Sequence, residues 1–208
     1  MTAGTEATGV VIAGGGSTRF DAGEKALATV GGEPMLRRVA DRVAPAVDAL
    51  VINCRADQRV RFADALAGID PEPTFAVDPV PDRGPLAGVE TALSAVGTDH
   101  AVLLACDLPL VRTPALEGLL DRLEPADADR PDCVLPTVEG RRQPLCGAYA
   151  VGPLADALAS IPTADRGLCG LLARLESTTV PASTLPGGPS SFRNVNTSGE
   201  LATVREVV

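Results

Sequence analysis

Short apolar runs alternate along the first two thirds of the chain with segments in which apolar residues recur every three to four positions. The apolar runs predict buried strands; the first opens at Val10, and the others are Asp48–Asn53, Thr74–Val77 and His100–Ala105. The periodic segments predict helices; these are the nine residues after Pro34, which is expected to be the first helical residue, then Ala56–Ala67, Pro85–Ala95 and Pro114–Leu123. This alternation is typical of β-α-β units. It predicts an α/β fold with a mostly parallel sheet covered by helices on both faces.

The last third of the chain has a less regular pattern. It predicts strands at Cys133–Thr137 and Pro144–Tyr149, joined by the basic segment Glu139–Gln143. It further predicts helices at Pro153–Leu158 and Leu168–Leu175, a loop at Ser183–Ser191, and a closing helix that ends near Val207 and has Thr197 or Ser198 as its N-cap.

Length and composition bound the class of protein. The 208 residues contain no linker-like tract, so one domain spanning residues 1–208 is expected. No apolar run approaches the roughly 20 residues of a membrane-spanning helix, and the N-terminus lacks the features of a secretion signal. Five cysteines without C-x-x-C spacing favour reduced, mostly buried thiols. We therefore expect a cytoplasmic protein.

Charge narrows the choice of partners. The net charge is −9 and only 2% of the residues are aromatic, which argues against nucleic-acid or membrane binding. Lys25 is the only lysine, beside 17 arginines. An acidic, lysine-poor composition is consistent with a halophilic organism, although a GC-rich genome also favours arginine over lysine.

A glycine-rich stretch follows the first predicted strand. Gly14, Gly15 and Gly16 are succeeded by Arg19 and Lys25. Backbone N–H groups without side chains, together with two nearby cations, suit the phosphates of a nucleotide. The P-loop is excluded because Lys25 follows a glutamate, and the dinucleotide fingerprint fails because Arg19 occupies its third glycine position. The alternative is a glycine turn with no ligand.

Two aspartates stand directly after predicted strands. Asp107 follows the most apolar strand, and Asp78 follows another. The carboxyl ends of parallel strands meet at one edge of a sheet, so both acids are candidates for that edge. Carboxylates near a phosphate-binding loop suit Mg²⁺, which usually binds through one or two carboxylates and the phosphates of its substrate. The alternative for Asp107 is a helix cap.

Five short motifs occur in order along nearly the whole chain. They are A-G-G-G-S-T-R at 13–19 with Lys25, G-P-L-A-G at 84–88, C-D-L-P at 106–109, R-Q-P-L at 142–145 and N-V-N-T at 194–197. Together they resemble the nucleotidyltransferases of the molybdenum cofactor guanylyltransferase family. The pair G-P-L-A-G and C-D-x-P is the most specific part of this resemblance.

The resemblance implies a Rossmann-like three-layer α/β/α sandwich similar to that of the nucleotide-diphospho-sugar transferases. It implies Mg²⁺-dependent transfer of GMP from GTP to molybdopterin, with a molybdoenzyme or another cofactor-biosynthesis protein as a further partner. Catalytic roles are implied for Lys25, Arg19 and Asp107, with Asp107 also as the metal ligand. The implied nucleotide-binding residues are Ala13, Gly14, Gly15, Lys25, Asn53, Asp78 and Asp107.

The residues expected to bind the acceptor are Arg142, Asn194 and Asn196. Arg141 and Arg142 carry planar forks that suit an acceptor phosphate, but a solvated hairpin tip would carry the same residues. Two departures from the family pattern stand out: Phe20-Asp21 replaces Met-Gly, and Ser198-Gly199 replaces Pro-Glu after N-V-N-T. The second departure affects the expected contacts to the pterin more than the expected nucleotide-binding site.

The chemistry itself is compatible with the residue content. An acceptor phosphate is already anionic, so its attack on the α-phosphorus needs no general base, in keeping with a single histidine, His100. Other readings stay open at this stage: transfer from CTP to molybdopterin, transfer from GTP to cobinamide phosphate or phospholactate, or a non-catalytic nucleotide-binding subunit. The base, the acceptor and the oligomeric state do not follow from the sequence.

Overall fold

The computed structural model describes residues 6–15, 24–81, 83–123, 130–162 and 167–206. Its strands are β1 (Ala7–Ile12), β2 (Thr29–Val30), β3 (Glu33–Pro34), β4 (Ala49–Cys54), β5 (Thr74–Val77), β6 (His100–Ala105), β7 (Cys133–Val138), β8 (Arg141–Arg142), β9 (Cys146–Ala150) and β10 (Ser177–Pro181). Its α-helices are α1 (Met35–Val43), α2 (Arg59–Ala65), α3 (Pro85–Leu93), α4 (Thr113–Leu123), α5 (Val151–Ser160), α6 (Leu168–Leu172) and α7 (Ser198–Arg205).

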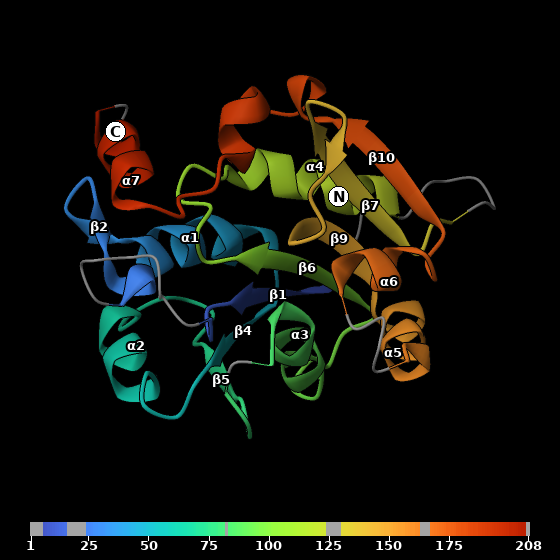
Figure 1. The fold of residues 1–208 in the computed structure, drawn as a ribbon, viewed down its shortest axis with the longest axis horizontal. Coiled ribbons are helices and arrows are strands. Elements are labelled where there is room, and N and C mark those ends of the chain that lie inside the picture. Colours follow the sequence, from blue (N-terminus) through green and yellow to red (C-terminus); the bar gives the residue numbers. More distant parts are fainter. Residues whose placement is uncertain (1–5, 16–23, 82, 124–129, 163–166, 207–208) are drawn as a thin grey trace.

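One sheet runs through the molecule in the order β10-β7-β9-β6-β1-β4-β5, with β8 paired to β7 (Figure 1). The pairs of β1 with β4, β1 with β6, β4 with β5 and β7 with β10 are parallel. Strand β9 runs antiparallel to both of its neighbours. The sheet is therefore mostly parallel, as the alternating pattern predicted.

Helices cover both faces of the sheet. On one face, apolar residues of α1, α2 and α4 pack against Val11, Leu50 and Leu104. On the other face, α3, α5 and α6 pack against Val10, Leu103 and Tyr149. Successive strand residues point to opposite faces, so neighbours such as Val10 and Val11 serve different cores. The α/β/α sandwich expected from the sequence is confirmed. Among the described residues, no helix is long and apolar enough to cross a membrane.

A third, smaller apolar cluster joins the two ends of the chain. Leu201 and Val204 of α7 pack with Val30 and Met35, next to the β2–β3 hairpin (Figure 1). Helix α7 begins at a capping box: the Thr197 side chain accepts from the backbone N–H of Glu200, whose carboxylate accepts from the backbone N–H of Thr197. This docking holds the segment before α7 against the centre of the molecule.

Several predicted boundaries were wrong. Pro34 is the N-cap of α1 and the last residue of β3 rather than the first helical residue. Helix α2 begins only at Arg59, because the Gln58 side chain accepts from the backbone N–H of Arg55 and closes a turn there. Strand β10 was not predicted. The segment Ser183–Ser191, predicted as a loop, takes part in two 3-10 turns at Ala182–Thr184 and Gly188–Phe192.

Candidate nucleotide-binding site

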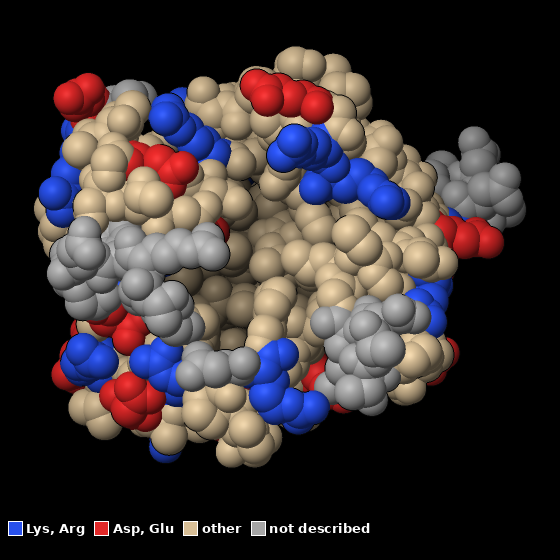
Figure 2. Space-filling view, in the orientation of Figure 1, with Lys and Arg blue, Asp and Glu red and all other residues tan. Residues whose placement is uncertain are grey.

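A cavity of about 530 Å³ opens at the carboxyl ends of β1, β4 and β6. Figure 2 shows this hollow near the centre of the face, at the place toward which the arrows of β1 and β6 point in Figure 1. Its walls come from the glycine loop, the ends of β4, β5 and β6, and the start of α3. The polar and charged residues that line it are Glu24, Lys25, Asn53, Asp78, Arg83 and Asp107.

Gly14 leaves room that a side chain would fill. A Cβ atom at position 14 would lie 2.5 Å from Oδ2 of Asp78 and 2.9 Å from Oδ1 of Asn53. Gly88, in the first turns of α3, is restricted in the same way, since its Cβ would lie 2.6 Å from Oδ1 of Asn53. Gly15 differs, because no atom of a described residue other than its chain neighbours lies within 4 Å of its Cβ position. Close packing therefore explains the glycines at 14 and 88.

Asn53 and Asp78 form a polar pair on the cavity wall. The Nδ2 group of Asn53 donates to Oδ1 of Asp78 at 2.7 Å and to the backbone oxygen of Ala76 at 3.3 Å. Asn53 is 1% exposed, and its Oδ1 has no hydrogen-bond partner among the described residues. A buried acceptor without a donor costs free energy, so a ligand N–H group at this wall would be stabilised.

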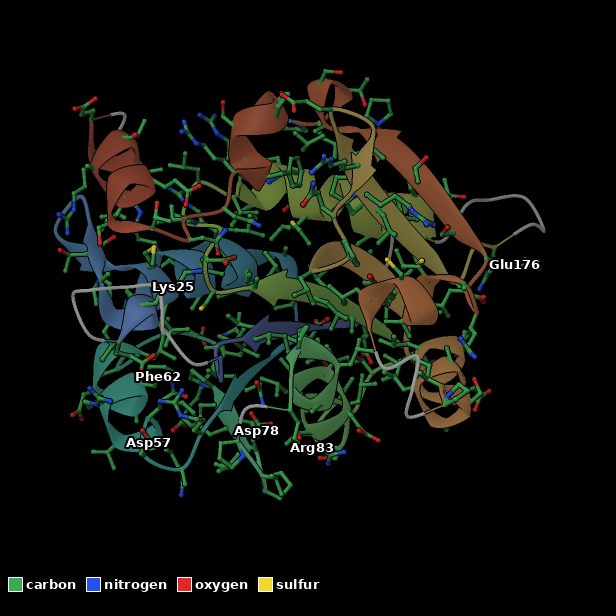
Figure 3. All side chains as sticks on the ribbon, viewed as in Figure 1. Lys25, Asp57, Phe62, Asp78, Arg83 and Glu176 are labelled. Atoms are coloured by element: carbon green, nitrogen blue, oxygen red, sulfur yellow. The ribbon has the colours of Figure 1, made fainter. Side chains whose placement is uncertain are left out.

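Lys25 and Asp107 meet although they are 82 positions apart. The Nζ of Lys25 lies 2.7 Å from Oδ2 of Asp107 and donates to Oδ1 of Asn196 at 2.8 Å. The backbone oxygen of Asp107 accepts from the N–H of Val195 at 2.9 Å. The segment before α7 is thereby held beside the strand end that carries Asp107. Figure 3 labels Lys25, Asp78 and Arg83, which all line the cavity, with Asp78 and Arg83 below the carboxyl end of β1 in that view.

Arg55 connects the two ends of the glycine loop. Its Nη1 group donates to the backbone oxygens of Gly14 at 3.3 Å and Gly15 at 3.2 Å. Its Nη2 group lies 3.4 Å from Oε2 of Glu24, whose side chain is only 8% exposed and also pairs with Arg61. One guanidinium thus contacts the chain just before the loop turns and just before Lys25. We refer to this contact as the Arg55 clasp.

The first turn of α3 faces the cavity with Gly84, Pro85, Ala87 and Gly88. Gly84, the N-cap, has φ 82° and makes no side-chain cap bond. The N–H groups at a helix start carry partial positive charge and attract anions, so this turn adds to the local positive potential. The potential matters because the protein as a whole is acidic.

Cys106 also borders the cavity. Burial raises the pKa of its thiol to about 12, and the neighbouring Asp107 carboxylate acts in the same direction. The thiol is therefore neutral at physiological pH. This state suits a small strand-end residue rather than a nucleophile.

The donor atoms at Asp107 fit a magnesium ion. Its Oδ2 atom faces Lys25, while its Oδ1 atom is buried and has no hydrogen-bond partner among the described residues. An unsatisfied carboxylate oxygen on a cavity wall is suited to a cation. In the described part of the chain, no three His, Cys, Asp or Glu side chains gather as a metal cluster. A site with one carboxylate would thus depend on substrate phosphates for further ligands, which is the usual arrangement for Mg²⁺.

Most of the sequence-predicted nucleotide residues line this cavity. Ala13, Gly14, Gly15, Lys25, Asn53, Asp78 and Asp107 all do so. Arg19 and Gly16 lie outside the described residues. The Arg55 clasp was missed, although a cation two positions after Asn53 at a strand end was a usable signal. Glu24 and Arg83 were also missed.

The predicted acceptor residues are more dispersed. Asn196 contacts Lys25, but Asn194 is exposed and does not line the cavity. Arg142 lies on β8 in an exposed hairpin, where its Nη1 group donates to Oγ of Ser177 at 3.4 Å. The hairpin turns at Glu139 and Gly140, both with positive φ. Arg142 is not among the described residues that line the cavity.

Comparison with known proteins assigns the family. The model of the "MobA-like NTP transferase domain" matches residues 9–179, which include every residue of the cavity wall. The chain belongs to the MobA-like NTP transferase family. This result confirms the resemblance drawn from the five sequence motifs. The enzyme class that goes with it is nucleotidyltransferase.

Named relatives of this MobA-like protein agree with the assignment. A "probable molybdenum cofactor guanylyltransferase" from Natronomonas pharaonis is 41% identical over 97% of this chain and 98% of its own. A protein of the same name from Haloferax mediterranei is 46% identical over 68% of this chain and 64% of its own. The crystal structure of molybdopterin-guanine dinucleotide biosynthesis protein A from Archaeoglobus fulgidus superposes with a TM-score of 0.76 at 25% identity, covering 96% of this chain and 97% of that chain.

Proposed function

We propose that this MobA-like protein is a Mg²⁺-dependent guanylyltransferase that transfers GMP from GTP to molybdopterin and releases pyrophosphate. The observation that carries the proposal is the 41% identity, over 97% of the chain, to a protein named as a molybdenum cofactor guanylyltransferase. The cavity supports it independently, because a glycine loop, a lysine, an aspartate and a helix N-terminus converge on one space.

The nucleotide would bind along the edge of the sheet. Gly14 and Gly15 allow the phosphates to approach the backbone, and Lys25 supplies a positive charge from the opposite side of the loop. Asn53 and Asp78 present an unsatisfied amide oxygen and a carboxylate deeper along the wall. Their acceptor oxygens suit the N–H groups of a purine base or the hydroxyl groups of a ribose.

The transfer step needs no side chain of the protein as a general base. An oxygen of the acceptor phosphate attacks the α-phosphorus of GTP, a new P–O–P link forms, and the bond between the α-phosphorus and the bridging oxygen breaks. Pyrophosphate leaves with the electron pair of that bond. Negative charge accumulates on the leaving group, and the Lys25 ammonium is positioned to offset it. Arg19 is proposed for the same task.

Asp107 is the proposed ligand of the magnesium ion, through the oxygen that lacks a partner. When bound, Mg²⁺ supplies charge neutralisation across the phosphates of the nucleotide. Lys25 and Asn196 hold the second oxygen of Asp107 and the adjoining chain in place. This arrangement also connects the nucleotide side of the cavity to the segment before α7.

The acceptor would enter from the side of that segment. Asn196 is already in contact with Lys25, so an acceptor phosphate near Asn196 would also be near the ammonium. Arg142 and Asn194 are proposed to contact the pterin or its phosphate when the acceptor is bound. Molybdopterin is the acceptor class that the named relatives suggest.

The test is a direct comparison of substrates. The protein is incubated with Mg²⁺, molybdopterin and one of GTP, CTP, ATP or UTP, while pyrophosphate release and dinucleotide formation are followed together. We expect both products with GTP at a rate at least about tenfold above the other nucleotides, the discrimination that one well-placed hydrogen-bonding contact supplies. A preference for CTP would contradict the guanine assignment. Equal release of pyrophosphate without molybdopterin would contradict the acceptor assignment.

A further inference from the structure

A second cavity, of about 540 Å³, lies apart from the nucleotide cavity. It is bordered by α1, by the loop between β6 and α4, and by the turn at residues 186–191. No described residue lines both cavities. Three of its lining residues are arginines: Arg38, Arg42 and Arg112. None of the described lining residues is acidic. The cavity lining is therefore positively charged, although the whole chain carries 27 acidic and 18 cationic residues and is negatively charged.

The three guanidinium groups have few partners of their own. The guanidinium groups of Arg42 and Arg112 make no hydrogen bond or ion pair with any described residue, and both residues are exposed. Arg38 is mostly buried; its Nη1 group approaches Glu33 at 3.6 Å and the backbone oxygen of Val30 at 3.4 Å. Its Nε atom is buried and has no hydrogen-bond partner in the described part of the chain. A buried donor of this kind is costly unless something absent from the chain accepts from it.

The walls around these arginines are held in place. The hydroxyl of Thr113 donates to the backbone oxygen of Arg42 at 2.8 Å, which joins the start of α4 to α1. Opposite, Gly187 has φ 84°, and a Cβ there would contact Oγ of Ser191 and lie 2.6 Å from Cδ of Arg112. The Arg112 side chain thus packs over a position that has no side chain. Pro109, Pro114 and Pro186 stiffen the rest of the rim.

Size and charge together indicate the kind of ligand. The volume is within the range of small-molecule pockets, about 300–1,000 Å³, rather than that of a flat surface for a macromolecule. Planar arginine forks match the oxygens of a phosphate group bidentately. We propose that the Arg38–Arg42–Arg112 cavity is a second binding site, specific for a small molecule that carries a phosphate group.

Phosphate binding is measured by calorimetry and ³¹P NMR at low ionic strength. Two phosphate ligands are used: inorganic phosphate, a free ion, and glycerol phosphate, a phosphate ester. A short polyglutamate peptide is the third ligand, and it tests whether the cavity binds an acidic peptide instead. The test variant is Arg42→Ala with Arg112→Ala. The matched control is Arg122→Ala with Arg174→Ala, which removes the same charge from two exposed arginines that donate to backbone oxygens in their own segments. A Lys25→Ala variant isolates binding at the nucleotide cavity.

We expect one of the two phosphates to bind the wild type, with at least about tenfold weaker affinity in the Arg42–Arg112 variant. The Arg122–Arg174 control and Lys25→Ala should retain this binding. Melting curves establish that all variants are folded. The proposal is overturned if neither phosphate binds, if the Arg42–Arg112 variant binds as the wild type does, if Lys25→Ala abolishes all binding, or if only the peptide binds. None of these outcomes depends on guanylyl transfer, so the proposed function is tested separately.

Discussion

At the scale of single residues, the candidate site combines residues that the local sequence pattern predicts with residues that only the tertiary fold brings into contact. Lys25, Asp107 and Asp78 were predicted because each follows a strand or a glycine loop. Asn53 was implied by the family resemblance, and all four residues line one cavity. The Arg55 clasp was not predicted, because its contacts to Gly14 and Gly15 span 40 positions or more and the local sequence offered just a cation after a strand end. The cavity of Arg38, Arg42 and Arg112 was missed for the same reason.

Gly14→Ala is expected to disrupt nucleotide binding, because its methyl group would overlap the Asn53–Asp78 pair. We predict a rise in the Kd for GTP of at least about tenfold, in line with the 1–3 kcal/mol cost of overpacking a filled site. Equilibrium titration with a fluorescent GTP analogue measures it. Gly15→Ala is the matched control, because its methyl group would have no described residue within 4 Å apart from its chain neighbours. Equal losses in the two variants would contradict this explanation.

Arg55→Ala is expected to act through the position of Lys25 and of the glycine loop. The contacts to Gly14, Gly15 and Glu24 would be lost, so we predict a kcat reduced about tenfold or more with a smaller change in KM. Steady-state kinetics separate the two constants. Arg55→Lys keeps the charge but not the fork, and should recover only part of kcat. An Arg55→Ala enzyme with unchanged kcat would remove the clasp from the mechanism.

At the scale of elements, the apolar strands were the most predictable. Strands β5 and β6 match their predicted bounds because, after the first residue, each is a continuous apolar run that an aspartate follows within two positions. Strand β10 escaped prediction because only Val180 among its five residues is buried and the sequence S-T-T-V-P is mostly polar. Its parallel pairing with β7 comes from the tertiary fold rather than from a local pattern. Helix α7, in contrast, was signalled by its capping residue.

The capping box of α7 should make part of the stability depend on pH. The backbone N–H of Asn196 is the main cause that holds the pKa of the Glu200 carboxyl below its ordinary value, since it donates to Oε2 at 2.7 Å. A depressed carboxyl pKa contributes stability above the unfolded value, about 4.3, and this contribution is lost as the pH falls through the folded value.

Glu200→Gln should therefore lower the melting temperature at neutral pH and have no effect at pH values well below 4. The expected loss is a few tenths of a kcal/mol, because the carboxylate lies at the surface. Melting curves across this pH range test the prediction, and Glu206→Gln, at the other end of α7, is the control. A Glu200→Gln effect that is equally large in acid would show that its cause is not the ionised carboxylate.

At the scale of the whole molecule, the fold places the nucleotide cavity and the Arg38–Arg42–Arg112 cavity in a protein of net charge −9. Acidic and basic side chains are interspersed over the face in Figure 2, and the hollow is lined mainly by uncharged groups. The layer order and the edge that carries the nucleotide cavity followed from the alternation of strands and helices. The hairpin that carries Arg142 depends on two positive-φ residues that the sequence pattern did not reveal.

The acidic, lysine-poor composition leads to a prediction about salt. Repulsion among 27 acidic residues is screened as ionic strength rises, because the Debye length falls from about 10 Å at 0.1 M to about 3 Å at 1 M. We expect the melting temperature to rise from dilute buffer to molar KCl, as for a protein adapted to concentrated electrolyte. Differential scanning calorimetry measures this, with a neutral osmolyte as control. Greater stability in dilute buffer would contradict the halophilic interpretation.

The proposed mechanism depends most of all on Asp107 and Lys25 acting together at one nucleotide site. The most direct test is single-turnover GMP transfer from GTP to molybdopterin by Asp107→Asn, which keeps the size of the side chain and removes its charge. Because a missing charge partner in such a site typically costs about 2.7–4 kcal/mol, we predict a rate reduced by about 10²–10³ with an unchanged fold. An Asp107→Asn protein that transfers GMP as fast as the wild type would contradict the account.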